Sequence, residues 1–372
     1  MANRGYGAGF GPVWRAVLRD YRVGEGNRAR ARLGFLTPPE GRGRVLWIKA
    51  GGSPDALRLG VELLGAVRDR RRDLRLVMTF ERDDPDLLRA VLRPWQRVGI
   101  GYGPCDRPRV VTRVLSRFQP CGIILVESDP PLNLLRRTLA PVAAVGTGPA
   151  PVPVAAAWPV SGAAQRDWEM NGQAGELLPP ADPQARFAEA QADVVLRTLA
   201  GGGERRLWWW HGRAQQWPEW LTAWRGMATA ADDILMASFA DTGAPEEAAL
   251  KVSAWDRSGL AGGSILHIDD RRWFAAAASA ADAVHLADPG RAVLWQALAA
   301  GCAVTLGKEA AAATLPVPML ASSGAVVDHW RRLRGDDHQR RSLGDAARRR
   351  FWEERRQVDA NLGALMDRVW TW

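Results

Sequence analysis

Apolar residues follow two patterns that recur along the chain. Short runs that are apolar throughout, such as Gly-Ile-Ile-Leu-Val at 122–126, are typical of parallel strands buried on both faces. Other stretches place apolar residues at helical spacing, as Val110, Val114 and Phe118 do before Pro120 ends that helix. The alternation of these two patterns predicts an α/β fold with parallel sheets.

The first half of the chain contains one such alternation. We expect strands at 44–50, 74–80, 122–126 and 141–145, with amphipathic helices between them. A Gly/Pro-rich loop is expected to begin at Gly101. From 146 to 183 the chain is rich in Gly, Pro and Ala without periodicity, which predicts an active-site loop leading into an interdomain linker.

The second half repeats the alternation, with strands expected at 206–211, 233–239, 264–268, 283–286 and 302–306. Thirteen of the 18 Trp residues lie beyond residue 200; we expect them to fill a large core, with sugar stacking or a protein interface as alternatives. The predicted organisation is an N-terminal segment (1–22), a first domain (23–150), a linker (151–184), a second domain (185–335) and basic C-terminal helices (336–372).

The N-terminal segment is amphipathic. Its apolar side chains fall on one helical face, with Arg15, Arg19 and Arg22 elsewhere: Phe10, Val13, Trp14, Val17, Leu18 and Tyr21. The helix either packs on its own domain or lies in the plane of an anionic membrane leaflet. No apolar run approaches the roughly 18 residues of a membrane-spanning helix, and no secretory signal is present. The expected location is therefore cytoplasmic, peripheral on a membrane.

The charge balance is basic, with 50 Lys and Arg against 41 Asp and Glu and a formal net charge of +9. Only Lys49, Lys251 and Lys308 are lysines, so the other 47 cations are Arg. A GC-rich genome explains such usage, and attraction to an anionic lipid surface is the functional alternative. No nucleic-acid-binding motif supports a nucleic-acid partner. Three separated Cys and five scattered His show no metal-ligand spacing, so no metal is expected.

A longer pattern runs from 102 to 135 and resembles the Kdo (3-deoxy-D-manno-octulosonic acid) transferases of lipopolysaccharide synthesis. The positions that carry it are Tyr102, Pro104, Asp106, Pro108, Arg117, Phe118, Pro120, Glu127, Asp129, Asn133, Leu134 and Leu135. Three further segments are similar to the family: Trp-Ile-Lys-Ala at 47–50, Ala-Ala-Asp-Ala-Val at 280–284 and Leu-Ala-Ala-Gly-Cys-Ala-Val at 298–304. Asp129 stands where the family has Glu, and the family's Asn-Ala-Arg-x-Ser stretch is replaced at 146–149.

This resemblance implies a glycosyltransferase B-type fold, in which two Rossmann-like domains face a cleft. It implies a metal-independent, inverting Kdo transferase that needs no cofactor. CMP-Kdo would be the donor and a lipid A precursor the acceptor, at the cytoplasmic face of the inner membrane. The sequence leaves open whether the site is active and which donor it takes.

The resemblance also implies roles for individual residues. Asp55 falls where the family has its catalytic Glu, and the implied acceptor-side residues are Lys49, Ser53, Glu127, Asp129 and Asn133. Local structure offers another explanation for the turn, because Ser53 is a good N-cap and Pro54 suits the first helical position. An acidic Asp55 in the first turn also opposes the helix dipole.

The donor side departs further from the family. Of the family's Gly-Gly-His-Asn-x-x-Glu motif the chain keeps Gly290, has Arg291 after it, and places Gln296 where a Glu would bind ribose. These three residues are the candidate donor-binding residues, with phosphate accepted at a helix N-terminus. The loss of the other donor groups supports an alternative function, a catalytically impaired paralogue that binds lipid or a protein partner.

Overall fold

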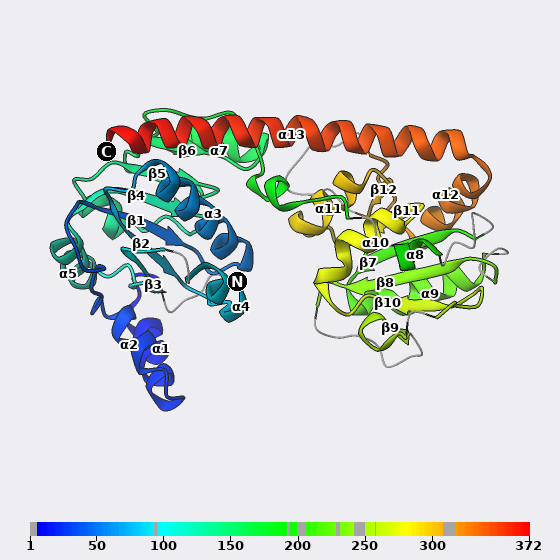
Figure 1. Ribbon diagram of the computed structural model, residues 1–372, viewed down its shortest axis with the longest axis horizontal. Helices are drawn as coiled ribbons and strands as arrows, with labels where there is room; N and C mark the ends of the chain where they lie inside the picture. Colours follow the sequence, from blue (N-terminus) through cyan, green and yellow to red (C-terminus); the bar gives the residue numbers. More distant parts are fainter. Residues whose placement is uncertain are drawn as a thin grey trace. The chain divides into compact units, whose positions relative to one another are not determined.

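The computed structural model describes residues 6–92, 95–191, 194–198, 205–227, 231–241, 250–256, 258–307 and 317–372. The chain divides into two compact units. The first unit comprises Met1–Pro183 with Gln357–Trp372, and the second comprises Gln184–Arg356. Each unit contains a six-stranded parallel sheet with helices on both faces (Figure 1). The predicted fold class, two Rossmann-like α/β domains, is therefore confirmed.

The first sheet has the strand order β3-β2-β1-β4-β5-β6. Its strands are β1 (Val45–Ala50), β2 (Arg75–Phe80), β3 (Val98–Tyr102), β4 (Pro120–Val126), β5 (Val142–Val145) and β6 (Ala156–Trp158). The helices of this unit are α1 (Phe10–Arg22), α2 (Gly26–Arg32), α3 (Pro54–Arg70), α4 (Pro85–Leu92), α5 (Pro108–Phe118), α6 (Leu132–Arg137) and α7 (Gly162–Asn171). The order reverses between β1 and β4, which makes this position the topological switch point of the sheet.

Side-chain alternation along the strands builds two apolar layers around the first sheet. Trp47 points to the face covered by α5, α6 and α7, where its ring meets Phe118 edge-on at 5.4 Å. Ala50 and Met78 point to the opposite face, where α3 approaches closely at Gly60. Because both faces are covered, all six residues of β1 are buried, as its apolar sequence predicts.

Two strands and one helix lie where the sequence predicts loops. Gly101 and Tyr102, expected in a Gly/Pro loop, are the last residues of β3, which pairs with β2 at the sheet edge. Within 151–184, where a linker is expected, the structure has β6 and α7, and Trp168 of α7 is buried. These elements are rich in Gly and Ala, so local periodicity does not reveal them. The strands β3 and β6 form because neighbouring strands supply the pairing, and Ser161 caps the start of α7.

The apolar face predicted for the N-terminal helix is divided in the structure. Val13 and Val17 of α1 are buried against a cluster that includes Cys105 and Val110. Phe10 is 63% and Tyr21 52% exposed. Trp14, Leu18 and Val23 are also exposed. The helix packs on its own unit, as one prediction states, and still presents apolar side chains to solvent.

The second sheet has the order β12-β11-β7-β8-β10-β9. Its strands are β7 (Leu207–Gly212), β8 (Ile234–Phe239), β9 (Leu250–Lys251), β10 (Ile265–His267), β11 (Ala283–Leu286) and β12 (Ala303–Leu306). The helices are α8 (Val194–Thr198), α9 (Trp217–Arg225), α10 (Phe274–Ala280), α11 (Arg291–Ala300), α12 (Ser323–Gly335) and the first part of α13 (Asp337–Thr371). The two-residue strand β9 is absent from the predicted elements, because so short a segment carries no pattern of its own.

Tryptophan fills the core of the second unit, as predicted. Trp208 and Trp330 stack with ring centroids 5.0 Å apart, and Trp210 and Trp220 stack at 6.0 Å. All four rings are at most 1% exposed. Burial of large aromatic surfaces contributes strongly to core stability, and stacked or edge-on contacts add to it. These rings therefore serve packing rather than ligand contact.

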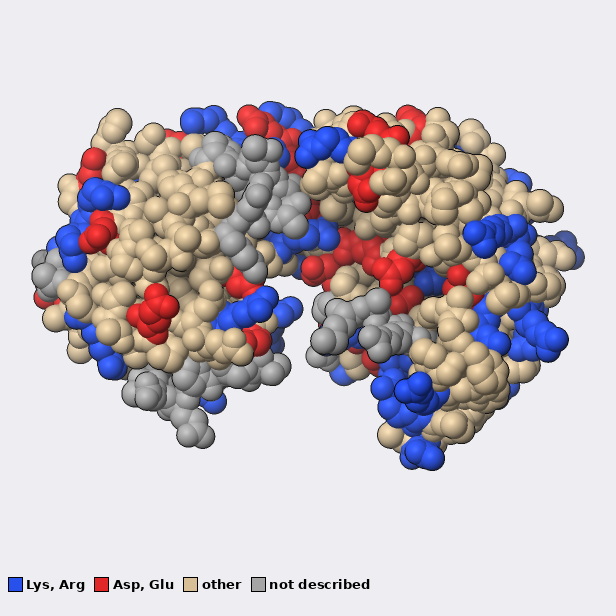
Figure 2. All heavy atoms as spheres, turned by 180° about the vertical axis from the view of Figure 1, so that it is seen from behind, with Lys and Arg blue, Asp and Glu red and all other residues tan. Residues whose placement is uncertain are grey.

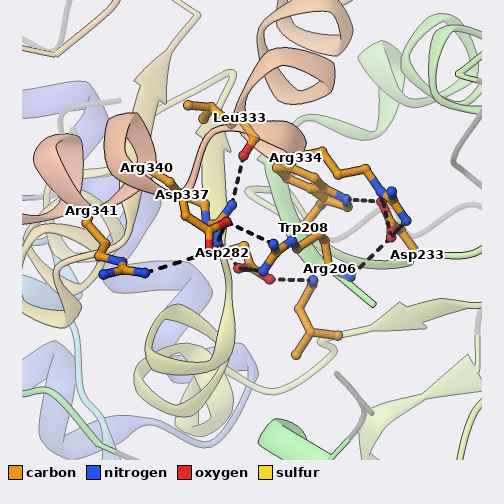
Figure 3. A network of polar contacts seen from close by, with 10 residues as sticks. Arg206, Trp208, Asp233, Asp282, Leu333, Arg334, Asp337, Arg340 and Arg341 are labelled. Atoms are coloured by element: carbon orange, nitrogen blue, oxygen red, sulfur yellow. Dashed lines mark hydrogen bonds and ion pairs between the residues drawn. The ribbon is translucent and has the colours of Figure 1, made fainter. Parts of the chain in front are cut away.

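An ion network secures α12 and α13 to the amino ends of the second sheet (Figure 3). Asp233, which is fully buried, accepts hydrogen bonds from the Arg334 guanidinium at 2.9 and 3.1 Å and from Trp208 Nε1 at 3.0 Å. Asp282 contacts Arg206 at 3.4 Å and Arg340 at 3.2 Å. Burial raises the pKa of Asp282, although these arginines oppose the rise. This network lies at the amino ends of the strands, whereas open parallel sheets bind ligands at the carboxyl ends.

Helix α13 contributes to both units, and the stretch Gln357–Trp372, which contains its last part, belongs to the first. Arg71 donates to the carbonyl oxygens of Val369 at 3.1 Å and Trp370 at 2.8 Å. Gly122 has no side chain because the indole of Trp372 occupies the space where a Cβ would lie. No helix in the described part of the chain is both long and apolar enough to cross a bilayer.

Candidate functional site

The turns that follow β1 and β4 meet at the switch point of the first sheet. The Gly51 amide donates to the Val126 carbonyl at 2.8 Å. A Cβ on Gly51 would overlap the carbonyl oxygen of Glu127, so only glycine permits this approach of the two turns. Open parallel sheets bind ligands outside the carboxyl ends of their strands at such a switch point. The acidic residues of both turns therefore lie where a ligand is expected.

Glu127 is the side chain that this region holds in place. Its backbone has φ +44°, in the left-handed region, and its amide donates to the Val145 carbonyl at 2.8 Å. Ser53 Oγ donates to Glu127 Oε2 at 3.2 Å. On the other side, a Cβ on Gly146 would lie 2.9 Å from Glu127 Cγ. A non-glycine residue in this region is strained, and such strain persists where surrounding contacts enforce it.

Ser53 and Asp55 begin α3 as the sequence predicts. Ser53 Oγ accepts a hydrogen bond from the Ala56 amide at 2.9 Å and so caps the helix, with Pro54 following. Asp55 lies half-buried in the first turn. The Ser53 hydroxyl thus accepts from the helix and donates to Glu127, which links the turn after β1 to the turn after β4.

Lys49 lies one residue before the end of β1 and is buried. Its Nζ forms an ion pair at 2.9 Å with Glu81 Oε1, and the two side chains are 5% and 13% exposed. Glu81 directly follows β2, and sequence reasoning did not single it out; its place after a buried strand is the available signal. The neighbouring Tyr102 hydroxyl donates to Asp83 at 2.7 Å. Burial, together with Asp83, raises the pKa of Tyr102, so the phenol stays protonated.

Asn133 and Asp106 hold each other. The two Asp106 carboxylate oxygens accept from the amides of Asn133 and Leu134, both at 2.9 Å, and the Asn133 side-chain amide donates to the Asp106 carbonyl at 2.7 Å. Burial raises the pKa of Asp106, against the effect of these hydrogen bonds and of Lys49. The contacts tie the loop after β3 to the start of α6. Asp129, in contrast, is exposed.

In the second unit, the candidate donor residues lie on α11. Gly290 is its N-cap residue, with no side-chain capping bond, and Arg291 is its first residue. The side-chain amide of Gln296 donates to the Glu189 carbonyl. Arg213, which follows β7, forms an ion pair with Asp288, which follows β11. Gln296 and Arg213 are thus engaged by groups of the same unit.

Two buried imidazoles lie near the carboxyl ends of β7 and β11 in the second sheet, and the sequence did not identify them as candidate site residues. His211 Nδ1 lies 2.8 Å from Ser238 Oγ, and His285 Nδ1 lies 3.0 Å from Thr305 Oγ1. Burial lowers the pKa of each to about 4, helped at His211 by the Arg271 charge. Both rings are therefore neutral near pH 7. Among the described residues, no group of three or more His, Cys, Asp or Glu side chains could hold a metal ion.

Solved structures with similar architecture define the fold class of the protein. A putative UDP-N-acetylglucosamine 2-epimerase from Listeria monocytogenes aligns with TM-score 0.54 at 12% identity, over 82% of this chain and 91% of that one. Anabaena Alr3699/HepE in complex with UDP-glucose aligns with TM-score 0.53 at 12% identity, over 87% and 100%. At this identity the likeness concerns the fold alone, and the fold is the glycosyltransferase B type.

Part of the first unit is similar in sequence to a known protein family. Residues 27–144 match the 3-deoxy-D-manno-octulosonic-acid transferase (Kdo transferase) family. The resemblance stated from the motifs is thus confirmed for this part of the chain. No curated protein matches the chain.

Proposed function

We propose that the protein transfers Kdo from CMP-Kdo to a lipid A precursor in lipopolysaccharide biosynthesis. The observation that carries this proposal is the carboxylate held at the switch point of a first domain that matches the Kdo transferase family. In this reaction an acceptor hydroxyl loses its proton to a carboxylate and attacks the anomeric carbon, while CMP leaves. Inversion follows from this single displacement.

The residues of the first unit divide into two roles in the proposed reaction. Asp55 and Glu127 are the carboxylates that face the acceptor in the proposed reaction, and Lys49, Ser53 and the exposed Asp129 contribute to acceptor binding. Asn133 acts indirectly, because its amide holds Asp106 and the loop after β3. In the second unit, the backbone amides at the start of α11, with Gly290 and Arg291, donate hydrogen bonds to the phosphate of the donor.

The protein reaches its lipid-linked acceptor through α1, which we place in the plane of the anionic inner-membrane leaflet at its cytoplasmic face. Figure 2 shows basic side chains beside uncharged ones at α1 and α2, the helical hairpin at one end of the first unit in Figure 1. Arg15, Arg19 and Arg22 are exposed on α1, whose apolar face is also open to solvent. Apolar insertion and attraction to anionic lipid act together in such helices.

The direct test is a transfer assay with CMP-Kdo and a lipid A precursor, read by the mass of the lipid product. We expect a mass increase of one or more Kdo units. Binding of the precursor without any mass increase contradicts the proposal. A parallel reaction without CMP-Kdo controls for precursor degradation.

A catalytically impaired paralogue is the alternative, favoured by the contacts on the donor side. Gln296 donates a hydrogen bond to the Glu189 carbonyl, and Arg213 forms an ion pair with Asp288. Both side chains already have partners in this unit that a donor would have to compete with. Loss of a charge-assisted hydrogen bond typically costs about 1.5–3 kcal/mol. The alternative therefore predicts precursor binding but no CMP binding in calorimetry, even near millimolar CMP. Micromolar CMP affinity would exclude it.

A further inference from the structure

The carboxylates of Asp55 and Glu127, at the carboxyl ends of the strands of the first sheet, are held in different ways. This difference indicates which of the two accepts the proton. Resting on the proposed transfer reaction, we propose that Glu127, and not Asp55, is the general base. Asp55 occupies the position that the family resemblance implies for the base. Glu127 occupies the position that the geometry of this structure supports.

The backbone of Glu127 is strained. Its φ of +44° is unfavourable for a residue with a side chain, and glycine would adopt it without strain. The structure nevertheless places a glutamate there, with a glycine on either side of it in space. Gly51 leaves room for its carbonyl and Gly146 for its side chain. Strain retained at one residue and accommodated by two glycines is typical of a functional position.

The carboxylate of Glu127 is held at the carboxyl end of a central strand. Glu127 directly follows β4, a central strand of the sheet, and its Oε2 accepts the Ser53 hydroxyl at 3.2 Å. One oxygen is oriented by that bond, and the carboxylate as a whole is half-buried at the switch point. A general base requires this kind of fixed orientation within hydrogen-bond reach of the hydroxyl that it deprotonates.

Asp55 is placed differently. It belongs to the first turn of α3, after the Ser53 cap and Pro54, where a negative charge stabilises the helix N-terminus. Its side chain is one methylene shorter than the family's Glu, and a displacement of about 1 Å can reduce a rate by about a hundredfold. The position of Asp55 is therefore explained by helix formation, whereas helix formation does not account for the left-handed conformation of Glu127.

The proposed step transfers one proton and exchanges one carbon–oxygen bond for another. A Glu127 carboxylate oxygen takes the proton of the acceptor hydroxyl as the hydroxyl oxygen forms its bond to the anomeric carbon of Kdo. The bond between that carbon and the CMP phosphate oxygen breaks, and CMP leaves with the electron pair. The proton remains on Glu127 until solvent removes it. Ser53 donates to the carboxylate throughout and changes no bond.

Chemical rescue tests the assignment. Glu127→Gly removes the carboxylate, leaves a cavity for a small acid and relieves the backbone strain. We expect transfer to fall by about a hundredfold or more, the usual contribution of a general base, with a melting temperature equal to or above that of the wild type. Added formate should raise the transfer rate of Glu127→Gly at least tenfold and leave the rate of the wild type unchanged.

Asp55→Ala, assayed with and without formate, is the matched variant. We expect its transfer rate to fall less than tenfold, because the start of α3 is weakened, and we expect formate not to raise that rate. Formate rescue of Asp55→Ala alone overturns the inference and leaves the proposed function standing. Absence of rescue in both variants also overturns it. A wild-type protein that forms no product overturns the proposed function, and the inference with it.

Discussion

At the scale of single residues, the site depends on what glycine and serine permit at two turns. Gly51 and Gly146 allow the chain to surround Glu127, and Ser53 orients its carboxylate. The N-cap role of Ser53 is readable from the sequence, since Ser-Pro-Asp before an apolar helix is a typical helix start. Its bond to Glu127 is not, because the two residues are 74 positions apart.

Replacement of Ser53 separates these two contacts. Ser53→Ala should lower the free energy of unfolding by about 1 kcal/mol, the usual cost of losing an N-cap, whereas Ser53→Gly should cost only about a few tenths. Both changes remove the bond to Glu127. Denaturant titration measures the losses. Equal losses in the two variants would show that the bond to Glu127, and not the cap, carries the stability.

At the scale of elements, polar contacts connect helices to the ends of the second sheet. Asp233 joins the start of β8 to α12 through Arg334, and to β7 through Trp208 (Figure 3). A fully buried carboxylate that loses its charged partner keeps its desolvation cost without the attraction that offsets it. The network should therefore respond strongly to loss of a single arginine.

We expect Arg334→Met to destabilise the second unit by about 3 kcal/mol, a magnitude typical of breaking a buried pair. The control is Arg331→Met, which breaks an exposed pair with Asp328 on the same helix and should change stability by about 0.5 kcal/mol or less. Thermal and denaturant unfolding of both variants provide the comparison. Similar losses in the two would contradict the importance of burial.

The neutral imidazoles of β7 and β11 make stability depend on pH. Because the folded-state pKa of His211 and His285 is lowered from 6.5 to about 4, the unfolded chain binds more protons than the folded one between these values. The contribution of the two neutral imidazoles to the free energy of unfolding is thus fully present above pH 6.5 and is lost as the pH falls toward 4. Each imidazole should contribute a loss of about 3 kcal/mol over this window.

Denaturant midpoints measured from pH 7 to pH 4 check this expectation. His285→Gln should remove part of the slope in that window, because glutamine does not titrate. An unchanged slope would show that other groups carry the acid sensitivity.

At the scale of the whole molecule, net charge and an exposed helix act together. The formal charge of +9 favours anionic surfaces in general, and α1 offers an apolar face with arginines beside it. Exposed apolar side chains grouped on one helix indicate an interaction site more strongly than scattered ones do.

We expect the protein to float with anionic vesicles and not with neutral ones, and to be released by salt. Trp14→Ala should weaken this association several-fold. Trp352→Ala, which removes an exposed tryptophan of α13 among arginines, is the matched control and should have little effect. Equal flotation with neutral and anionic vesicles would contradict the electrostatic part. A larger effect of Trp352→Ala would place the contact on α13.

The sequence by itself determined the strands buried on both faces and their alternation with helices. Continuous apolar runs such as 122–126 indicate parallel strands, because a strand that is covered on both faces buries all of its side chains. It also determined the start of α3 at Ser53 and the family resemblance over 27–144. These are local properties, carried by neighbouring residues or by a motif read in order.

Only the tertiary structure decided which distant groups meet. It made β3 and β6 strands by edge pairing, divided the apolar face of α1, and engaged Asn133 with Asp106 and Gln296 with Glu189. It also held Glu127 in a left-handed conformation between two turns. Contacts of this kind join residues far apart along the chain, and local periodicity carries no information about such pairings.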